Sequence, residues 1–497
     1  MSAFNFETPS RQSAKGIIVI FGVSAYKILK GLAIAFIALF LKYIKSDKSP
    51  DLTSPIFILS CIGLVVLFLL IAVLRFLNFK FFIKDNYFFL RKGIFNKEEI
   101  SISKDKIQNV YIKQNVIQQL INVVSLSIET AGDDKTEIEI TALSRDKALA
   151  LKEYLLSGLK LIDNKDVQIA EETVYFKASV KKLLLEGITE NHFKSFVLIF
   201  AFIVGIYNDI KEFISELNLS SKFGKWFQLD NESIIGLLLI NVTLIVTLLI
   251  LSFLLSLIRM LIQNFDLTVK IKPNGLEISK GLLNKINLSL TNSRIQNTIA
   301  STNRVKRALG LYKLSFTQAM INKKQQLKFN IVGLSKLQLD ELIQQFYPNV
   351  QNRLTKHKPQ KYLLYRMLWI GFMVIAIINL GLYFSPKLFL LANIPFIAFV
   401  MANAMITYKK AYFHIDEELI VVGYGMLIET HTSYLEIKKT QAVTLNQTIF
   451  QKRRGIASVV VNSASKSITI PHVDLQTANE IKNYLIYKVE YENKDWM

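Results

Sequence analysis

The sequence predicts an α+β membrane protein in which six transmembrane helices, arranged as three hairpins, alternate with three antiparallel β domains that each end in a helix. Hydrophobic residues make up 51% of the 497 residues and the mean hydropathy is +0.32, which is high for a soluble protein. The net charge of +21 fits a membrane protein whose polar parts lie on the cytoplasmic side. A polar segment that follows the apolar regions also recurs three times along the chain.

The apolar runs predict the six spans. A span requires about 20 apolar residues, and four runs without a charged residue reach that length: 55–74, 233–258, 367–386 and 388–408. Two weaker runs, 16–44 and 195–208, each precede a strong run and so complete a hairpin. For these two runs an interfacial or re-entrant helix is the alternative.

The distribution of basic residues predicts the orientation. Lysine and arginine gather where each hairpin begins and ends, for example at Lys181, Lys182 and Arg259. The tip at 208–232 instead carries five acidic residues against three lysines. Because loops rich in lysine and arginine stay in the cytoplasm, we expect a multi-pass protein of the inner membrane with both termini and all large polar regions in the cytoplasm.

Each polar region changes from strand-like to helix-like patterning along its length. Alternating or β-branched segments such as "VSLSIETA" and "TEIEITAL" predict strands. The following "SRDKALALKEYLLSGL" has helical spacing, with Ala148, Leu151 and Leu155 on one face. The predicted domains are hairpin 1 (16–77), β domain 1 (78–160), hairpin 2 (178–262), β domain 2 (264–348), hairpin 3 (362–408) and β domain 3 (409–490).

The three polar regions are repeats of one unit. A glycine precedes a motif glutamine by 15, 15 and 16 residues, and an alanine that closes the next strand follows that glutamine by 23 residues each time. We interpret the glycines as turn or bulge positions and the glutamines as structural hydrogen-bonding residues. These motif residues are Gly93, Gln108, Gly281, Gln296, Gly425 and Gln441. Three such copies, each behind an apolar hairpin, define a unit of hairpin plus β domain.

The repeated order of glycine, polar strand, "[KR]IQ-x-[VT]", short helix, strand ending in alanine, hairpin and final helix resembles the bacterial pleckstrin-homology (PH) domain family, in the form found in YdbT-like membrane proteins. The resemblance covers nearly the whole chain. The third copy departs from it, because "KKTQAV" replaces the Ile-Gln pair by Thr-Gln. The resemblance implies small curved antiparallel sandwiches, each closed by its C-terminal helix, and it does not imply an enzyme.

The segment after each motif is the candidate binding region. It is nearly uncharged in the first copy ("NVIQQLINV") and basic in the other two. The candidate residues for binding lipid or a partner are Arg304, Lys306, Arg307, Lys313, Lys452, Arg453 and Arg454. Basic residues near an anionic membrane surface contribute about 1 kcal/mol each to binding. The alternative is a solvated charged face of a basic cytoplasmic protein.

Catalytic and cofactor motifs are absent from the sequence. The five histidines have no metal-ligand spacing, and the single cysteine, Cys61, excludes an intrachain disulfide and a cysteine-cluster metal site. We find no Gly-rich phosphate loop or nucleophile elbow. The apolar runs also lack the acidic residues that ion-coupled transport requires. We therefore expect no enzyme, no cofactor, no metal and no nucleic-acid partner.

Three hypotheses remain at this point. The first is a membrane scaffold whose PH-like domains bind partner proteins or anionic lipid, in envelope maintenance or stress protection. The second is a lipid-handling or transport protein with a path among the six helices. The third is an accessory subunit of a larger complex, with a smaller PH-domain membrane protein as a possible partner.

Overall fold

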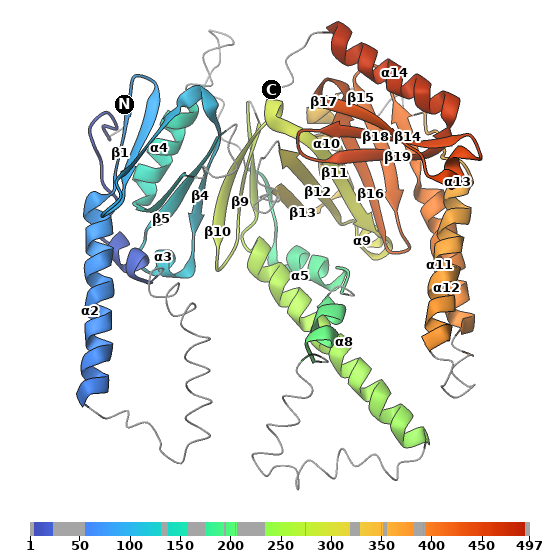
Figure 1. Ribbon diagram of the computed structural model, residues 1–497, viewed down its shortest axis with the longest axis horizontal. Helices are drawn as coiled ribbons and strands as arrows, with labels where there is room; N and C mark the ends of the chain where they lie inside the picture. Colours follow the sequence, from blue (N-terminus) through green and yellow to red (C-terminus); the bar gives the residue numbers. More distant parts are fainter. Residues whose placement is uncertain are drawn as a thin grey trace. The chain divides into compact units, whose positions relative to one another are not determined.

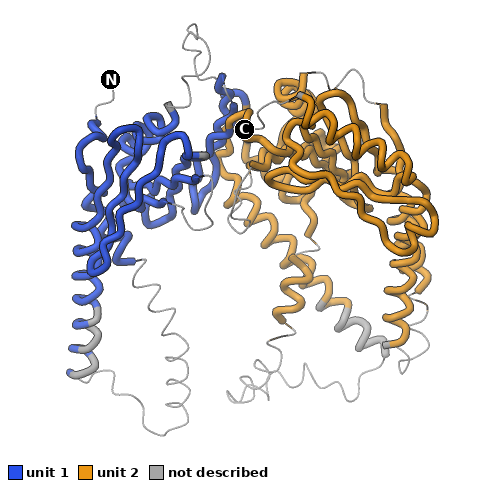
Figure 2. The backbone as a smooth tube through the Cα atoms, turned by 45° about the horizontal axis from the view of Figure 1, so that its top comes forward, with its two compact units in different colours: residues 1–175, 269–290, 321–325 blue, residues 176–268, 291–320, 326–497 orange. Residues whose placement is uncertain are grey.

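The computed structural model describes residues 4–22, 55–130, 138–157, 174–192, 195–203, 205, 234–273, 275–318, 329–348, 350, 355–381, 391 and 393–492 (Figure 1). Helices and antiparallel sheets both occur along these ranges, which confirms the α+β class. The chain divides into two compact units (Figure 2). Unit 1 comprises residues 1–175, 269–290 and 321–325, and unit 2 comprises 176–268, 291–320 and 326–497.

Two of the sheets contain the strands of unit 1. A three-stranded sheet has the order β1-β2-β3 and a seven-stranded sheet has the order β6-β5-β4-β10-β9-β8-β7. The first-repeat strands are β1 (Lys80–Lys84), β2 (Tyr87–Lys92), β3 (Glu98–Ser103), β4 (Ile107–Gln114), β5 (Val124–Thr130) and β6 (Ile138–Leu143). The others are β7 (Val174–Lys177), β8 (Thr268–Lys272), β9 (Gly275–Lys280) and β10 (Lys285–Thr291). β7 lies at the boundary between the units.

The other two sheets lie in unit 2. A six-stranded sheet has the order β13-β12-β11-β16-β15-β14 and a three-stranded sheet the order β17-β18-β19. The six strands are β11 (Ile295–Asn303), β12 (Tyr312–Gln318), β13 (Phe329–Leu334), β14 (Tyr412–Ile415), β15 (Leu419–Gly425) and β16 (Glu429–Glu436). The last three are β17 (Thr440–Asn446), β18 (Ile456–Ser463) and β19 (Ser467–Asp474).

Each repeat contributes two groups of three strands to different sheets. In the first repeat, β1–β3 and β4–β6 pack around one core that includes Phe81, Phe88, Leu126 and Ile140. The helix α4 (Arg145–Ser157) covers this core with Leu151, which is fully buried. In the third repeat, β14–β16 and β17–β19 enclose a second core, which α14 (Leu475–Glu492) covers with Ala478, Ile481 and Leu485. These two sandwiches each end in a C-terminal helix.

The second repeat is divided between the units. Its first three strands, β8–β10, join the sheet of unit 1, and its last three, β11–β13, join the sheet of unit 2. Its C-terminal helix is α10 (Lys336–Phe346), which begins with a capping box formed by Ser335 and Gln338. As a result, neighbouring repeats share one continuous sheet at each boundary.

Long apolar helices precede the sheets. They are α2 (Pro55–Asn78), α8 (Ile234–Asn264), α11 (Tyr362–Gly381) and α12 (Asn393–Lys410). Within the described ranges, Ile245–Asn264 and Tyr362–Leu380 are long and apolar enough to cross a membrane, and Val65–Asn78 is a shorter apolar stretch. Only 11% and 6% of the two long stretches are buried, so their side chains are not part of a soluble core. Of the weaker predicted runs, 16–44 is described only to residue 22 and 195–208 only at 195–203 and 205, and six spans remain a prediction.

Candidate membrane-proximal site

The path of each strand determines which turns lie near the apolar helices. In each repeat a helix of the hairpin leads directly into the first strand, as α2 leads into β1 at Lys80. Antiparallel strands then alternate in direction, so the turn after the second strand and the turn after the fourth return to the end where that helix enters. We call this the helix-proximal end of a repeat. In Figure 1, α3 (Val116–Leu120) lies on the side of its sheet from which α2 extends.

The turn after the fourth strand of each repeat contains a short, capped helix. These helices are α3, α9 (Arg304–Ala308) and α13 (Ile449–Lys452). Each begins with a side chain that accepts a hydrogen bond from the backbone N–H three residues later, and the caps are Asn115, Asn303 and Thr448. The third helical residue is buried in every case: Gln118, Lys306 and Gln451. The caps fix the turn, and the other helical positions face outward.

The helix-proximal turns expose large apolar side chains. On the short helices these are Val116, Ile117, Leu120, Val305, Ile449 and Phe450, together with Leu309 directly after α9. The turns after the second strands expose Phe95, Leu282, Leu283, Met426 and Ile428, and Phe95 is 100% exposed. A group of exposed apolar side chains at one end of a domain is typical of a membrane or protein contact. Two apolar residues follow the motif glycine in all three repeats, which is the sequence signal that marks these turns.

On the short helices, basic side chains accompany the apolar ones in the second and third repeats only. Arg304 and Arg307 are exposed on α9. Lys452, Arg453 and Arg454 are exposed at the end of α13. Lys313 is half-buried in β12. Lys306 is buried in an ion pair, so its ammonium group does not belong to this exposed basic set.

In each repeat, residues beside the short helix contact the segment that begins the predicted hairpin. In the first repeat, Val19 packs on Val123 and Ala142, next to α3. In the second, the Asn303 side chain donates to the backbone oxygen of Thr189, directly after α5 (Val180–Ile188), at 2.6 Å. In the third, the Arg454 guanidinium lies 5.2 Å from the ring centre of Tyr362, the first residue of α11. The same structural junction therefore occurs three times.

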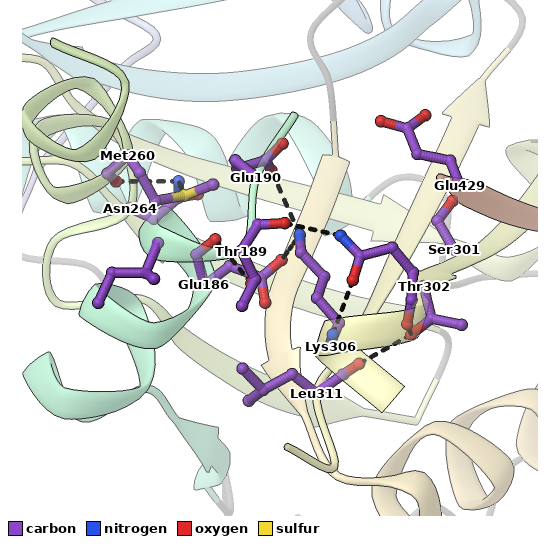
Figure 3. A network of polar contacts seen from close by, with 12 residues as sticks. Glu186, Thr189, Glu190, Met260, Asn264, Ser301, Thr302, Lys306, Leu311 and Glu429 are labelled. Carbon is purple, nitrogen blue, oxygen red and sulfur yellow. Dashed lines mark hydrogen bonds and ion pairs between the residues drawn. The ribbon is translucent and has the colours of Figure 1, made fainter. Parts of the chain in front are cut away.

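The second junction contains a buried ion-pair network (Figure 3). The Lys306 ammonium lies 2.5 Å from one Glu186 carboxylate oxygen and 3.4 Å from a carboxylate oxygen of Glu190. The Glu186 side chain is fully buried, and its other carboxylate oxygen has no hydrogen-bond partner among the described residues. Burial raises the pKa of Glu186, and the Lys306 charge opposes this rise. Glu186 belongs to a nine-residue helix outside the predicted spans.

The third junction uses neutral groups in place of the ion pair. The Gln451 amide lies 2.7 Å from His472 Nδ1, and the His472 ring packs edge-on against Tyr362. Burial, with a smaller contribution from the Arg366 charge, lowers the pKa of His472 to about 4. The imidazole is therefore neutral at pH 7 and adds no second charge beside Arg366. In the first junction Gln118 donates to Ser125 and to the Thr141 backbone oxygen.

The motif glycines close the turns after the second strands. Gly93 and Gly281 both have φ +111°, and a Cβ on either would lie about 2 Å from the backbone oxygen of Asn96 or Asn284. A Cβ on Gly425 would lie 2.3 Å from the backbone oxygen of Glu429. Only glycine fits these close approaches without a shift of the turn.

The motif glutamines occupy β-bulges. The strand register shifts between Ile107 and Asn109, between Ile295 and Asn297, and between Thr440 and Ala442. Gln108, Gln296 and Gln441 are thus the extra residue of each bulge. Gln296 is buried and Gln441 is exposed, whereas the Gln108 side chain lies outside the described part of the structure. The described residues contain no cluster of metal-ligating side chains.

Comparison with known proteins finds three matching segments along the chain. The family model "Bacterial PH domain" matches residues 19–159, 227–348 and 367–489. The chain is also similar to the UPF0699 transmembrane protein YdbT of Bacillus subtilis (strain 168), with 22% identity over 456 residues. That alignment covers 86% of this chain and 89% of the relative.

Proposed function

The chain belongs to the bacterial PH domain family, and from that premise we propose that it is a non-enzymatic membrane scaffold whose helix-proximal turns bind anionic lipid headgroups. The observation that carries this proposal is the exposure of apolar and basic side chains on the short helices, beside the start of each hairpin. PH domains in general bind lipids or proteins and are not catalytic in kind. The physiological role that we propose is envelope maintenance or stress protection.

The composition of the exposed turns supports an interfacial contact. Ile449 and Phe450 are 74% and 68% exposed. The transfer of an apolar side chain from water into the headgroup region lowers the free energy and so favours binding. The neighbouring Lys452 and Arg453 then lie where lipid phosphates lie. Each basic residue contributes about 1 kcal/mol near an anionic surface. On α9, Val305 and Leu309 accompany Arg304 and Arg307 in the same way.

The repeats differ in the charge of their short helices. The short helix α3 of the first repeat exposes Val116, Ile117 and Leu120 but has no charged residue. We propose that α3 makes only an apolar contact with the interface and that headgroup selectivity resides in α9 and α13. Six spans, with both termini and all three PH-like domains on the cytoplasmic side of the inner membrane, complete this proposal.

The first test compares two variants of the full chain, each with four basic residues replaced by serine. The test variant carries Arg304→Ser, Arg307→Ser, Lys452→Ser and Arg453→Ser. The control carries Lys84→Ser, Lys106→Ser, Lys438→Ser and Lys466→Ser, which are exposed residues at the opposite ends of the strands. Both variants lose the same charge. Each protein is purified in nanodiscs of phosphatidylcholine with one quarter phosphatidylglycerol, and the lipid retained after detergent extraction is measured by mass spectrometry.

We expect the native chain and the control variant to retain phosphatidylglycerol several-fold above its share in the nanodisc. The test variant should lose most of that enrichment. Raising the salt concentration should lower the enrichment of the native chain, because exposed charges are screened within about 10 Å at 0.1 M salt. Equal enrichment in the test and control variants would contradict the headgroup site and leave the basic turns as solvated surface.

A further inference from the structure

The two sheet boundaries between repeats have the same construction. At each boundary the third strand of one repeat pairs antiparallel with the fourth strand of the preceding repeat, β10 with β4 and β16 with β11. Side chains also join across them: Ser301 Oγ lies 2.8 Å from His431 Nδ1, and Lys152 Nζ lies 2.6 Å from Asn287 Oδ1. The boundary is thus an interface between PH-like repeats that occurs twice in one chain.

The register is identical at both boundaries. Lys285 pairs with Gln114, and Thr430 pairs with Thr302. Lys285 and Thr430 each lie seven residues before the 3-10 turn that ends their strand, at Asn292–Arg294 and Ile437–Lys439. Their partners each lie six residues after the motif glutamine. At both boundaries, therefore, the residue seven positions before the 3-10 turn of the third strand pairs with the residue six positions after the motif glutamine of the fourth strand.

Among the strands that the structure describes, one of each type has no strand partner at its outer edge. β3 is the edge strand of the sheet β1-β2-β3, and β17 is the edge strand of β17-β18-β19. The equivalents of β17 are central strands with mostly buried residues, whereas β17 itself has four exposed residues of seven. β17 contains no charged residue and no proline, the features that usually protect an edge strand.

The turns beside these edges are also uncovered. At the first boundary the Gln119 amide donates to the backbone oxygens of Leu282 and Leu283, both at 3.0 Å, so α3 covers the turn of the next repeat. At the second, Asn303 beside α9 pairs with Glu429. The equivalent turn before β3 contains Phe95, which is 100% exposed, compared with 40% and 44% for Leu282 and Leu283. The equivalent short helix beside β17 is α13.

We propose that β17 of one chain pairs with β3 of a second copy of this chain and continues the sheet across two molecules. The conserved register places Asn446 opposite Glu98 and Thr444 opposite Ile100. The Glu98 carboxylate forms an ion pair with Lys92 at 3.2 Å and can also accept from the Asn446 amide, at the position where Ser301 and His431 are hydrogen-bonded in the second boundary. A second copy is the occupant that the structure favours, because one chain supplies both strand types and neither has a strand on its outer edge among the described residues. The interface is head-to-tail, and it does not depend on headgroup binding.

Cysteine cross-linking tests the register. Two differently tagged full-length chains, both with Cys61→Ser, are expressed together, one with Asn446→Cys and the other with Glu98→Cys. The control replaces Glu98→Cys by Ser101→Cys, which is also exposed and lies about 10 Å further along the strand and on its other face. A disulfide requires Cβ atoms about 3.5–4.5 Å apart. We expect oxidation of the membranes to link the two tags several-fold more in the first pair than in the control.

A charge substitution at the same position tests the proposed strand pairing independently. Asn446→Asp places a carboxylate opposite Glu98, and like charges directly opposite each other destabilise a strand pair. We expect about two- to fivefold weaker association of the solubilised full chain, measured by light scattering, and recovery in the double variant Asn446→Asp/Glu98→Lys. Equal cross-linking in both pairs, a link between two Asn446→Cys chains, or capture of a smaller protein by Asn446→Cys without self-linking would each overturn the proposal.

Discussion

At the scale of single residues, the second junction differs from the other two in one buried position. The third residue of the short helix is glutamine in the first and third repeats and Lys306 in the second. Lys306 brings a buried carboxylate, Glu186, and the two charges compensate each other. An ion pair of this kind is sensitive to the loss of one partner, because the remaining charge stays buried and uncompensated.

The first prediction concerns this pair. Lys306→Gln leaves Glu186 buried without its counter-charge, and we expect a loss of about 3–5 kcal/mol in the free energy of unfolding of this region. The double variant Lys306→Gln/Glu186→Gln should recover most of that loss, since glutamine occupies this position in the other two repeats. The thermal unfolding midpoint of the full chain in detergent measures both effects. A double variant as unstable as the single one would show that the charge pair is not the cause.

The sequence allowed only part of this site to be predicted. The spacing of Arg304, Lys306 and Arg307 predicted one basic cluster, and Arg304 and Arg307 are indeed exposed. The burial of Lys306 could not be predicted, because its partner Glu186 is 120 residues away in sequence. The sequence shows only that the aligned position is a neutral glutamine in the other two repeats, Gln118 and Gln451.

At the scale of elements, the turns after the second strands control the boundaries between repeats. The turn that begins at Gly281 leads directly into β10, the strand that pairs with β4. A side chain at Gly281 would collide with the Asn284 backbone oxygen, so the turn would have to open. Gly310 has a positive φ of 68° as well, but a Cβ there would meet open space.

These two glycines give a matched pair of variants. Gly310→Ala should lower the free energy of unfolding by about 1 kcal/mol, the usual effect of a side chain in the left-handed region. Gly281→Ala should lower it by more, because the collision adds to the same conformational effect. Chemical denaturation of the full chain gives the difference, and amide exchange should localise it to β9 and β10. Equal effects of the two substitutions would mean that the turn relaxes without disturbing the strands.

The three repeats could be predicted from the sequence, but the joining of neighbouring repeats in one sheet could not. Periodicity and spacing predicted strands and a final helix in each polar region, and the structure has them in β1–β6 with α4 and in β14–β19 with α14. Which strand lies next to β4 depends on contacts between residues about 170 positions apart, such as Gln114 and Lys285. Local sequence patterns contain no information on such pairings, so three separate sandwiches were the natural expectation.

At the scale of the whole molecule, the predicted hairpins imply that all three PH-like domains lie on the same side of the membrane. Each repeat follows a predicted hairpin, and every predicted hairpin has both ends on one side of the membrane. The predicted tip at 208–232 lies outside the described residues, whereas the turn between β18 and β19 belongs to the third PH-like domain.

The corresponding prediction uses single cysteines in a Cys61→Ser background. In intact cells, a membrane-impermeant maleimide should label Ser220→Cys, which lies in the tip, after removal of any outer barrier. Lys466→Cys, in the turn between β18 and β19, should react only after the inner membrane is permeabilised. Labelling of Lys466→Cys in intact cells would reverse the predicted orientation, and protection of both positions would argue against a tip that reaches the far side.

Because the register is identical at the two boundaries, whole repeat units can be duplicated or deleted in the gene without loss of the strand pairing. Duplication or loss of one whole unit, hairpin plus PH-like domain, would join the same two strand types in the same way. A chain of two, three or four units would then still begin with a β3-type edge and end with a β17-type edge. The number of units can therefore change during evolution without the need for a new pairing surface between repeats or between chains.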